Sequence, residues 1–391
     1  MRYNFDKVID RSGTSAEKVE GLKHIWGRTD LIPLWVADMD FATAPFVTDA
    51  IRKRCENEVL GYTGKPDSYY NAIINWVKQR YDLIVTKEVI NFVPGIVPGI
   101  GMAMNCFTQK GDKVMIQPPV YHPFAWVTTR NERTLVINPL KWENGMYRMD
   151  LDAFREQIKG CKLFILCNPH NPGGVVWTEA ELRAIADICY DEKVLVFSDE
   201  IHADLTLPPH THRPFATVCE KARMNSVTFM SPSKAFNMPG LSASHALIFN
   251  EDLRKRFRIY MDAGELDMGH VFAFLSVEAA YSHGTEWLDQ CLAYIQGNID
   301  FVDEFLKKHA PKIKAIRPEA SYLVWLDCRE LELSQKDLNE FFVDKAHLAL
   351  NDGEMFGKEG IGFMRLNVAS PRCIIEKAMK QLADAYQLYI K

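Results

Sequence analysis

The sequence predicts an α/β fold built on a large, mainly parallel β-sheet. From residue 90 to about residue 250, short and nearly all-apolar segments alternate with segments of helical spacing. All-apolar strands are typical of sheets covered on both faces, and strands separated by helices pair in parallel. The chain has 391 residues, of which 47% are hydrophobic and 25% are charged. That composition is ordinary for a globular protein, and the length allows two or three domains.

Charge, apolar runs and cysteines narrow the class of protein further. The formal net charge is -5 without a basic tail, which argues against nucleic acid and anionic membrane as partners. The first residues lack the apolar run of a signal peptide, and the longest apolar window, 92–107, is interrupted by proline and glycine and falls short of a membrane span. Nine scattered cysteines without paired spacing suit a reducing cytosol. We therefore expect a cytoplasmic protein that binds neither nucleic acid nor membrane.

The first ninety residues hold few strong patterns. Residues 1–35 show little periodicity, and residues 34–41 form an apolar stretch that runs into two acids. Residues 45–59 favour a helix with a weak apolar stripe, and residues 69–81 favour a second helix with a clearer one. A turn at residues 61–64 separates the two.

The middle of the chain carries the sheet. The expected strands are Val114–Gln117, Leu135–Asn138, Leu163–Cys167, Val194–Ser198, Ser226–Met230 and Ala246–Phe249. The clearest helix between them is Thr178–Glu192, because Thr178 and Glu181 form a capping-box pattern ahead of a helical stripe. In such a sheet the ligand site is expected beyond the carboxyl ends of the strands.

The last part of the chain predicts a smaller α+β domain. Its expected elements are a long helix at Glu286–Lys308, a strand at Tyr322–Leu326, a helix at Gln335–Ala346, a strand at Phe363–Val368 and a final helix from Pro371. We expect a large domain over residues 46–285, with residues 1–45 and 286–391 forming the small one.

Three expected strands end in polar residues that suggest chemistry. One runs into residues 168–174, where two Asn-Pro steps and two glycines make a rigid loop that permits close approach. Another runs into Asp199 and Glu200, which cannot both face one site because strand side chains alternate. The third ends just before Lys234, whose apolar neighbours would lower the pKa of the ammonium group and make the amine a nucleophile. Taken alone, these residues favour an ordinary surface lysine in a loop.

A helix start after residues 92–99 offers backbone amides suited to a phosphate group. An amine nucleophile, a carboxylate, an amide side chain and a phosphate cradle at strand ends are together what pyridoxal phosphate requires. The lysine would bind the aldehyde, the carboxylate would keep the ring nitrogen protonated, and the asparagine would donate to the ring hydroxylate.

At this point the chain resembles a known family along nearly its whole length. It is similar to the fold-type I pyridoxal-phosphate enzymes of the aspartate aminotransferase superfamily, and within them to the MalY/PatB group of cystathionine and cysteine-S-conjugate β-lyases. The matching motifs, in order, are LWVADMDF at 34–41, GYTG at 61–64, PPVYHPF at 118–124, NPHNPGG at 168–174, SDEIHADL at 198–205, SPSKAFNMPGL at 231–241 and RLNVASPR at 365–372. Each motif is weak alone, but seven in order are specific.

The resemblance implies a role for each matching residue. Lys234 matches the lysine that binds the cofactor covalently, Asp199 its ring-nitrogen partner, Asn171 the donor to the ring hydroxyl, and Tyr121 the aromatic ring stacked on the cofactor. The remaining matches are His202 beside the cofactor, Ser231, Ser233, Ile96 and Val97 in the phosphate cup, Tyr62 lent to that cup by a second subunit, Arg365 on the substrate carboxylate and Ala37 beside it. Tyr62 in that role implies a homodimer with shared active sites.

Two positions depart from the family pattern. Many aminotransferases carry an arginine eight residues after the lysine to hold the phosphate, and this chain has Ser242 there. Val175 stands where an arginine often follows the Asn-Pro turn, and we attach no functional weight to it. A zinc site built from His202, Asp204, His210 and His212 is an alternative that lacks a regular ligand spacing.

The reaction implied is β-elimination from a sulfur-containing amino acid such as cystathionine or cysteine, giving thiol, pyruvate and ammonia. Transamination begins with the same proton removal, so residue spacing does not separate it from elimination; the LWVADMDF stretch and Ser242 favour the lyase. An aminotransferase and a cofactor-binding regulator that acts through a protein partner therefore stay open as alternatives.

Overall fold

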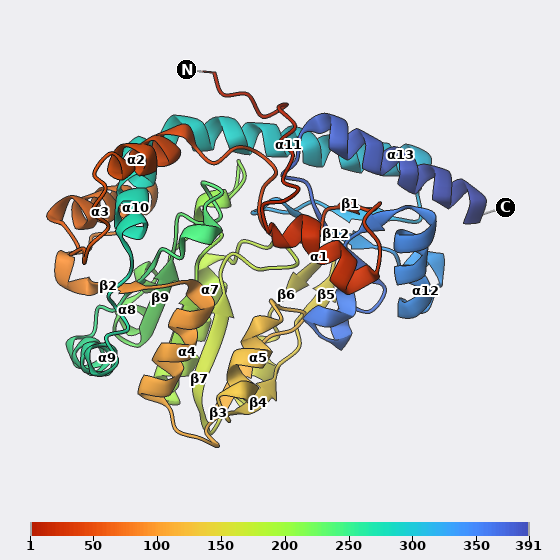
Figure 1. Ribbon diagram of the computed structural model, residues 1–391. Helices are drawn as coiled ribbons and strands as arrows, with labels where there is room; N and C mark the ends of the chain where they lie inside the picture. The colour runs from red at the N-terminus through yellow and green to blue at the C-terminus, as the bar shows by residue number, and fades with distance from the viewer. Residues whose placement is uncertain (1, 390–391) are drawn as a thin grey trace.

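A computed structural model describes residues 2–389 and contains the expected sheet (Figure 1). Seven strands lie in the order β2-β10-β9-β8-β7-β3-β4. Their bounds are β2 Ile90–Val93, β3 Lys113–Ile116, β4 Thr134–Ile137, β7 Cys161–Cys167, β8 Leu195–Asp199, β9 Ser226–Met230 and β10 Ser244–Leu247. β10 pairs antiparallel with both β2 and β9, and the remaining pairs are parallel. The mainly parallel sheet is confirmed.

Helices cover both faces of this sheet, and the alternation along β7 explains why. Leu163 and Ile165 pack in the core that includes α4 (Ile96–Phe107). Phe164 and Leu166, which point the other way, pack in the core that includes α7 (Glu179–Asp191). A strand buried on both sides has no polar face, which is why its sequence is continuously apolar.

The expected capping box at the start of α7 is present. The backbone N–H of Glu181 donates to Thr178 Oγ1, and the N–H of Thr178 donates to Glu181 Oε2 at 2.8 Å. The helix then buries Leu182 and Ile185 against the sheet.

The C-terminal part contains an antiparallel sheet of four strands in the order β11-β12-β15-β14. These strands are Lys314–Ile316, Leu323–Asp327, Phe363–Asn367 and Asn351–Asp352 respectively. Two long helices, α11 (Thr285–His309) and α13 (Arg372–Tyr389), lie together along one side of the molecule (Figure 1). The smaller α+β part is thus confirmed, whereas the division at residues 46–285 stays a prediction.

Several elements escaped the sequence patterns. They are α1 (Glu17–Trp26), β1 (Ile32–Pro33), β2, α5 (Pro123–Arg130), the hairpin β5–β6 (Lys141–Glu143 and Met146–Arg148), α6 (Leu151–Gln157), α8 (Glu220–Met224), α10 (Val271–His283), β11, β13 (Leu348–Ala349) and β14. α9 (Glu251–Ala263) contains the basic run 254–258, which the sequence predicts to be a solvated helix face. The helix expected over 335–346 is split into α12 (Gln335–Glu340) and a π-helical turn, Phe341–Lys345.

Two helix boundaries near the N-terminus also differ from expectation. α3 (Asp67–Tyr81) begins two residues earlier than predicted, whereas α2 (Pro45–Cys55) stops short of the predicted end at Val59. The Asn57 side chain accepts a hydrogen bond from the N–H of Val59 at 3.1 Å, forming a local turn that competes with the helix. Val59 is itself largely exposed, so it does not extend an apolar stripe.

Candidate active site

A pocket opens where the sheet, the start of α4 and the loop after β9 meet. It is lined by nine of the twelve residues that the sequence nominated, and they come from six separate segments of the chain. These nine are Ala37, Ile96, Val97, Tyr121, Asn171, Asp199, His202, Ser233 and Lys234. The strand ends therefore meet at one site, as the parallel sheet predicted.

Lys234 follows β9 and reaches the floor of this pocket. Its Nζ donates a hydrogen bond to the backbone carbonyl of Ala37 at 2.5 Å. Burial lowers the pKa of Lys234 to about 8, with Arg365 acting in the same direction while Asp38 and Asp199 oppose it. A substantial fraction of this amine is therefore neutral, and nucleophilic, near physiological pH.

Asp199 ends β8 and is almost completely buried. Its Oδ1 accepts a hydrogen bond from the N–H of Ile201 at 3.1 Å, and within residues 2–389 no lysine, arginine or histidine forms an ion pair with it. Burial, reinforced by nearby Glu200, raises the pKa of Asp199 to about 7 against the opposing effects of the Ile201 N–H and Lys234. A buried carboxylate without an ion-pair partner is destabilised, and a cationic group on a bound ligand would stabilise it.

Glu200 faces the opposite way, as the strand alternation predicted. It accepts hydrogen bonds from Ser198 Oγ at 2.8 Å and from the N–H of Phe215 at 2.8 Å, and its Oε2 lies 2.9 Å from His212 Nε2. Groups of the protein already hydrogen bond to both oxygens of this carboxylate, so Glu200 has a structural role and is not available to a ligand.

Arg365 on β15 lies directly behind the pocket lining. Its Nη1 donates to Asn171 Oδ1 at 3.1 Å and its Nη2 donates to the carbonyl of Trp35 at 3.1 Å. The buried Nε has no hydrogen-bond partner, and burial lowers the pKa of Arg365 to about 10. Since Arg365 occupies the oxygen of Asn171, the amide NH₂ of Asn171 is the end left to donate to a ligand.

His202 and Tyr121 complete the walls. His202 Nδ1 is buried without a hydrogen-bond partner, and burial, followed by the charges of Lys234 and Arg365, lowers the pKa of His202 to about 3. The imidazole is therefore neutral and can donate one hydrogen bond into the pocket. The Tyr121 ring lies across the pocket lining and meets Phe124 edge-to-face, with centroids 5.7 Å apart.

The start of α4 forms the expected anion cradle. Gly95, Ile96 and Val97 line the pocket at the N-terminus of this twelve-residue helix, where backbone N–H groups and the helix dipole favour an anion. Ser233 also lines the pocket. Ser231 does not: its Oγ hydrogen bonds to the carbonyl of Ala243 at 2.8 Å and accepts from the N–H of Ser233, so it braces the lysine loop.

Two serines of the pocket lining were not among the predicted site residues. Ser244 was missed, and Ser242 was noted only because it replaces an arginine of the family pattern. Ser242 and Ser244, just before and within β10, both line the pocket. The expected strand began at Ala246, two residues too late, so Ser244 lay outside it. The pattern Ser-x-Ser ahead of an apolar run is the signal that would have placed both hydroxyls at a strand start.

These observations fit pyridoxal phosphate. A helix N-terminus flanked by hydroxyls suits the phosphate, and Asp199, which lacks a cation in the protein, suits a protonated ring nitrogen. The unpartnered His202 Nδ1 and the NH₂ of Asn171 suit a ring oxygen. Lys234 supplies an amine with a lowered pKa.

Tyr62 lies away from this pocket. Its side chain is 98% exposed, on a surface loop beside residues 265–271. A tyrosine so exposed does not serve the site of its own chain, and its predicted contribution to a second subunit stays a prediction.

The four residues of the alternative zinc site are engaged elsewhere. Asp204 accepts hydrogen bonds from Trp76 and Tyr81, and His212 pairs with Glu200. His210 Nδ1 lies 3.7 Å from a Glu319 oxygen, and His202 faces the pocket. Across residues 2–389 no cluster of three or more histidine, cysteine or acidic side chains is arranged to hold a metal ion. The same part of the chain has no helix that is both long and apolar enough to cross a bilayer.

Residues 29–382 match the family model for aminotransferases of class I and II, and the chain belongs to this family. Among curated proteins it is 38% identical to the cystathionine beta-lyase PatB of Bacillus subtilis, covering 98% of this chain and 99% of PatB. It is 30% identical to the protein MalY of Escherichia coli, covering 98% of each. Among solved structures, cystalysin from Treponema denticola, which contains pyridoxal 5'-phosphate, superposes over the whole of both chains with a TM-score of 0.96 at 33% identity. The resemblance to the MalY/PatB group is confirmed.

Proposed function

We propose that this protein is a pyridoxal-phosphate-dependent carbon–sulfur lyase that converts thioether amino acids of the cystathionine type, with water, into a thiol, pyruvate and ammonia. One observation carries the proposal: Lys234, whose amine has a lowered pKa, lines the same pocket as Asp199, a buried carboxyl group that forms no ion pair with a described side chain. The full-length similarity to PatB, a protein named cystathionine beta-lyase, supports the same reaction.

The cofactor would be held by the residues described above. Lys234 would bind its aldehyde, and the Ile96 and Val97 amides with the Ser233 hydroxyl would receive its phosphate, since all four residues line the pocket. When bound, pyridoxal phosphate supplies an electron-withdrawing ring that stabilises negative charge developing at the substrate Cα. Asp199 keeps the ring nitrogen protonated, because a cation beside this buried carboxylate is more stable than a neutral group.

Arg365 is the residue for the substrate carboxylate. Its buried Nε has no hydrogen-bond partner among the described residues, and its Nη1 contacts Asn171, which lines the pocket. A guanidinium group binds a carboxylate through two parallel hydrogen bonds, which fixes orientation as well as position.

Lys234 would act as the general base once its amine is no longer bound to the cofactor. Because the pKa of Lys234 is lowered, the neutral amine can accept the proton from Cα. The carbon–sulfur bond at Cβ then breaks, and the sulfur leaves as a thiolate with the bonding electron pair. The Ala37 carbonyl, which accepts a hydrogen bond from Nζ, keeps the amine oriented during this exchange.

The proposal includes a homodimer in the cytosol. Tyr62, Val59 and Leu60 form an exposed apolar group on one loop, which a second copy would cover, and Tyr62 would then reach that copy's phosphate cup. The nine cysteines are free thiols, which suits a reducing compartment.

The test is to incubate the purified holoenzyme with L-cystathionine and to measure thiol, pyruvate and ammonia together. The proposal predicts equal amounts of all three and unchanged cofactor content over many turnovers. A keto acid formed without thiol would instead indicate transamination. Absence of any product from a protein that has bound the cofactor would contradict catalysis and favour a regulatory role.

A further inference from the structure

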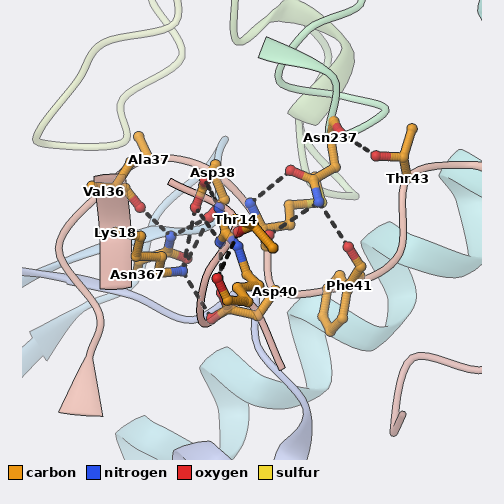
Figure 2. A network of polar contacts seen from close by, with 12 residues as sticks. Thr14, Lys18, Val36, Ala37, Asp38, Asp40, Phe41, Thr43, Asn237 and Asn367 are labelled. Carbon is orange, nitrogen blue, oxygen red and sulfur yellow. Dashed lines mark hydrogen bonds and ion pairs between the residues drawn. The ribbon is translucent and has the colours of Figure 1, made fainter. Parts of the chain in front are cut away.

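Residues 34–41, here called the strap, run past the pocket, and Ala37 of this segment lines it. Side chains hold most of the strap's backbone carbonyls, whereas the carbonyl of Leu34 accepts from the backbone N–H of Asn367 at 3.0 Å. Asn367 Nδ2 donates to the carbonyls of Val36 and Asp38 at 2.7 Å each (Figure 2). Arg365 donates to the carbonyl of Trp35. The carbonyl of Ala37, between these anchors, accepts from Tyr322 OH at 2.9 Å and from Lys234 Nζ.

The lysine loop grips the second half of the strap. Asn237, three residues after Lys234, accepts from the N–H of Met39 at 3.0 Å and donates to the carbonyls of Met39 and Phe41 at 3.0 Å and 2.7 Å (Figure 2). The strap and the lysine loop therefore form one hydrogen-bonded unit. A shift of the strap would carry the Ala37 carbonyl away from the amine that it holds.

A cluster of four charges, none of which lines the pocket, anchors the strap. Lys18 on α1 is completely buried, and its Nζ lies 2.8 Å from an Asp40 oxygen and 3.6 Å from an Asp38 oxygen. Arg11 contacts Asp38 at 2.6 Å and Asp40 at 3.1 Å. Two cations face two carboxylates, so the cluster is balanced, and removing one member leaves a buried charge without compensation.

We propose that Lys18, Arg11, Asp38 and Asp40 form a charge-balanced clamp that positions the Ala37 carbonyl against the Lys234 amine. In this role Lys18 and Arg11 are positioning residues that act on the reaction through the strap. The inference rests on the proposed function of Lys234.

The clamp also contributes to the electrostatic potential at the Lys234 amine. The charged and titratable groups that face Lys234 are Asp38 on the strap, Asp199 on β8, Arg365 on β15 and the neutral His202. Asp38 stabilises the ammonium form of Lys234 and is itself neutralised by Lys18 and Arg11. Loss of a clamp cation therefore increases the negative potential at Lys234, and loss of the Asp38 charge decreases it.

The experiment compares Lys18→Met and Asp38→Asn in the full-length holoenzyme. The pH midpoint of the cofactor's visible absorbance reports protonation of the nitrogen of Lys234. We expect Lys18→Met to raise this midpoint and Asp38→Asn to lower it, each by roughly half to one pH unit. Lys18→Met should also lower kcat by about 10- to 100-fold, with a smaller change in KM, because the base is misplaced. Lys23→Met, at an exposed lysine on the same helix, is the matched control and should match the wild type.

Opposite shifts support the clamp, because a merely structural role would leave both midpoints in place while lowering cofactor content. Unmoved midpoints, or shifts in the same direction, would overturn it. Should Lys18→Met fail to fold, Arg11→Gln changes the less buried cation of the same cluster and should raise the midpoint in the same way. A wild-type protein without any titrating cofactor band would instead refute the proposed function, so the two failures are distinguishable.

Discussion

Asp199 and Glu200 are neighbouring carboxylates at the end of one strand, yet Asp199 lines the pocket and Glu200 lies in the core on the other face of the sheet. Asp199 faces the pocket with a single backbone donor and a pKa raised by burial. Glu200 faces the α7 side and receives donors from Ser198, Phe215 and His212. Both carboxylates are buried, so burial does not distinguish them. The ligand-binding carboxylate is the one that the protein leaves with few hydrogen-bond donors.

The largest effect should come from the lysine on the pocket side. Lys234→Ala removes both the covalent anchor and the base, so turnover should fall by about 10⁴-fold or more. Steady-state thiol release measures this loss. Lys255→Ala, at an exposed lysine on α9, should leave the rate unchanged. A near-normal rate for the Lys234 variant would remove the basis of the proposed chemistry.

Asp199→Asn should have the next largest effect on activity. The amide cannot hold a proton on the ring nitrogen, and loss of such an electrostatic partner lowers kcat by about 10²- to 10³-fold. Thiol release at saturating substrate, with cofactor content determined separately, measures the change. Activity within twofold of wild type would show that Asp199 does not contact the reacting system.

The same substitution should stabilise the cofactor-free protein. The folded-state pKa of Asp199 is raised from 3.8 to about 7, so the folded state binds a proton that the unfolded state releases. Stability from this group therefore falls as pH rises from about 4 to 7, by at most roughly 4 kcal/mol. Denaturant unfolding at pH 5 and pH 8 should show a smaller pH dependence in Asp199→Asn than in the wild type. An equal pH dependence would place the titrating group elsewhere.

Glu200→Gln should show the opposite pattern. It weakens a fully satisfied buried network, so the free energy of unfolding should drop by about 1–3 kcal/mol. Turnover per folded molecule should stay within a few-fold of wild type. A large loss of kcat without loss of stability would abolish the contrast between the two carboxylates.

The smallest effect lies on the α7 side, away from the chemistry. Thr178→Ala removes the capping box of α7 and should cost about 1 kcal/mol of stability. Thermal unfolding measures it, with Thr178→Ser, which keeps the hydroxyl, as the control. Neither variant should change kcat, and a change would indicate that α7 influences the pocket.

Local patterns predicted much of this structure. Continuous apolar strands such as Leu163–Cys167 and the Thr178–Glu181 capping box were readable because burial and capping follow from neighbouring residues. The pocket residues were predictable because strand ends of a parallel sheet converge. Helices such as α10 and strands such as β2 were missed since their stability depends on partners distant in sequence.

The strap shows the same limit at the site. Its motif identified Ala37, but Lys18 lies in a segment where the sequence showed little periodicity and predicted no element. Only the fold brings Lys18 to Asp40 and brings Asn367 and Tyr322 to the strap carbonyls. Side-chain contacts across hundreds of residues leave no local spacing to recognise.

The central claim is that Lys234 holds the cofactor covalently. The direct measurement is borohydride reduction of the holoenzyme, followed by proteolysis and mass spectrometry of every lysine-containing peptide. The account predicts that the peptide containing Lys234 gains the mass of the reduced cofactor, in proportion to the cofactor bound. An unmodified Lys234, or a label carried by another lysine, would contradict it.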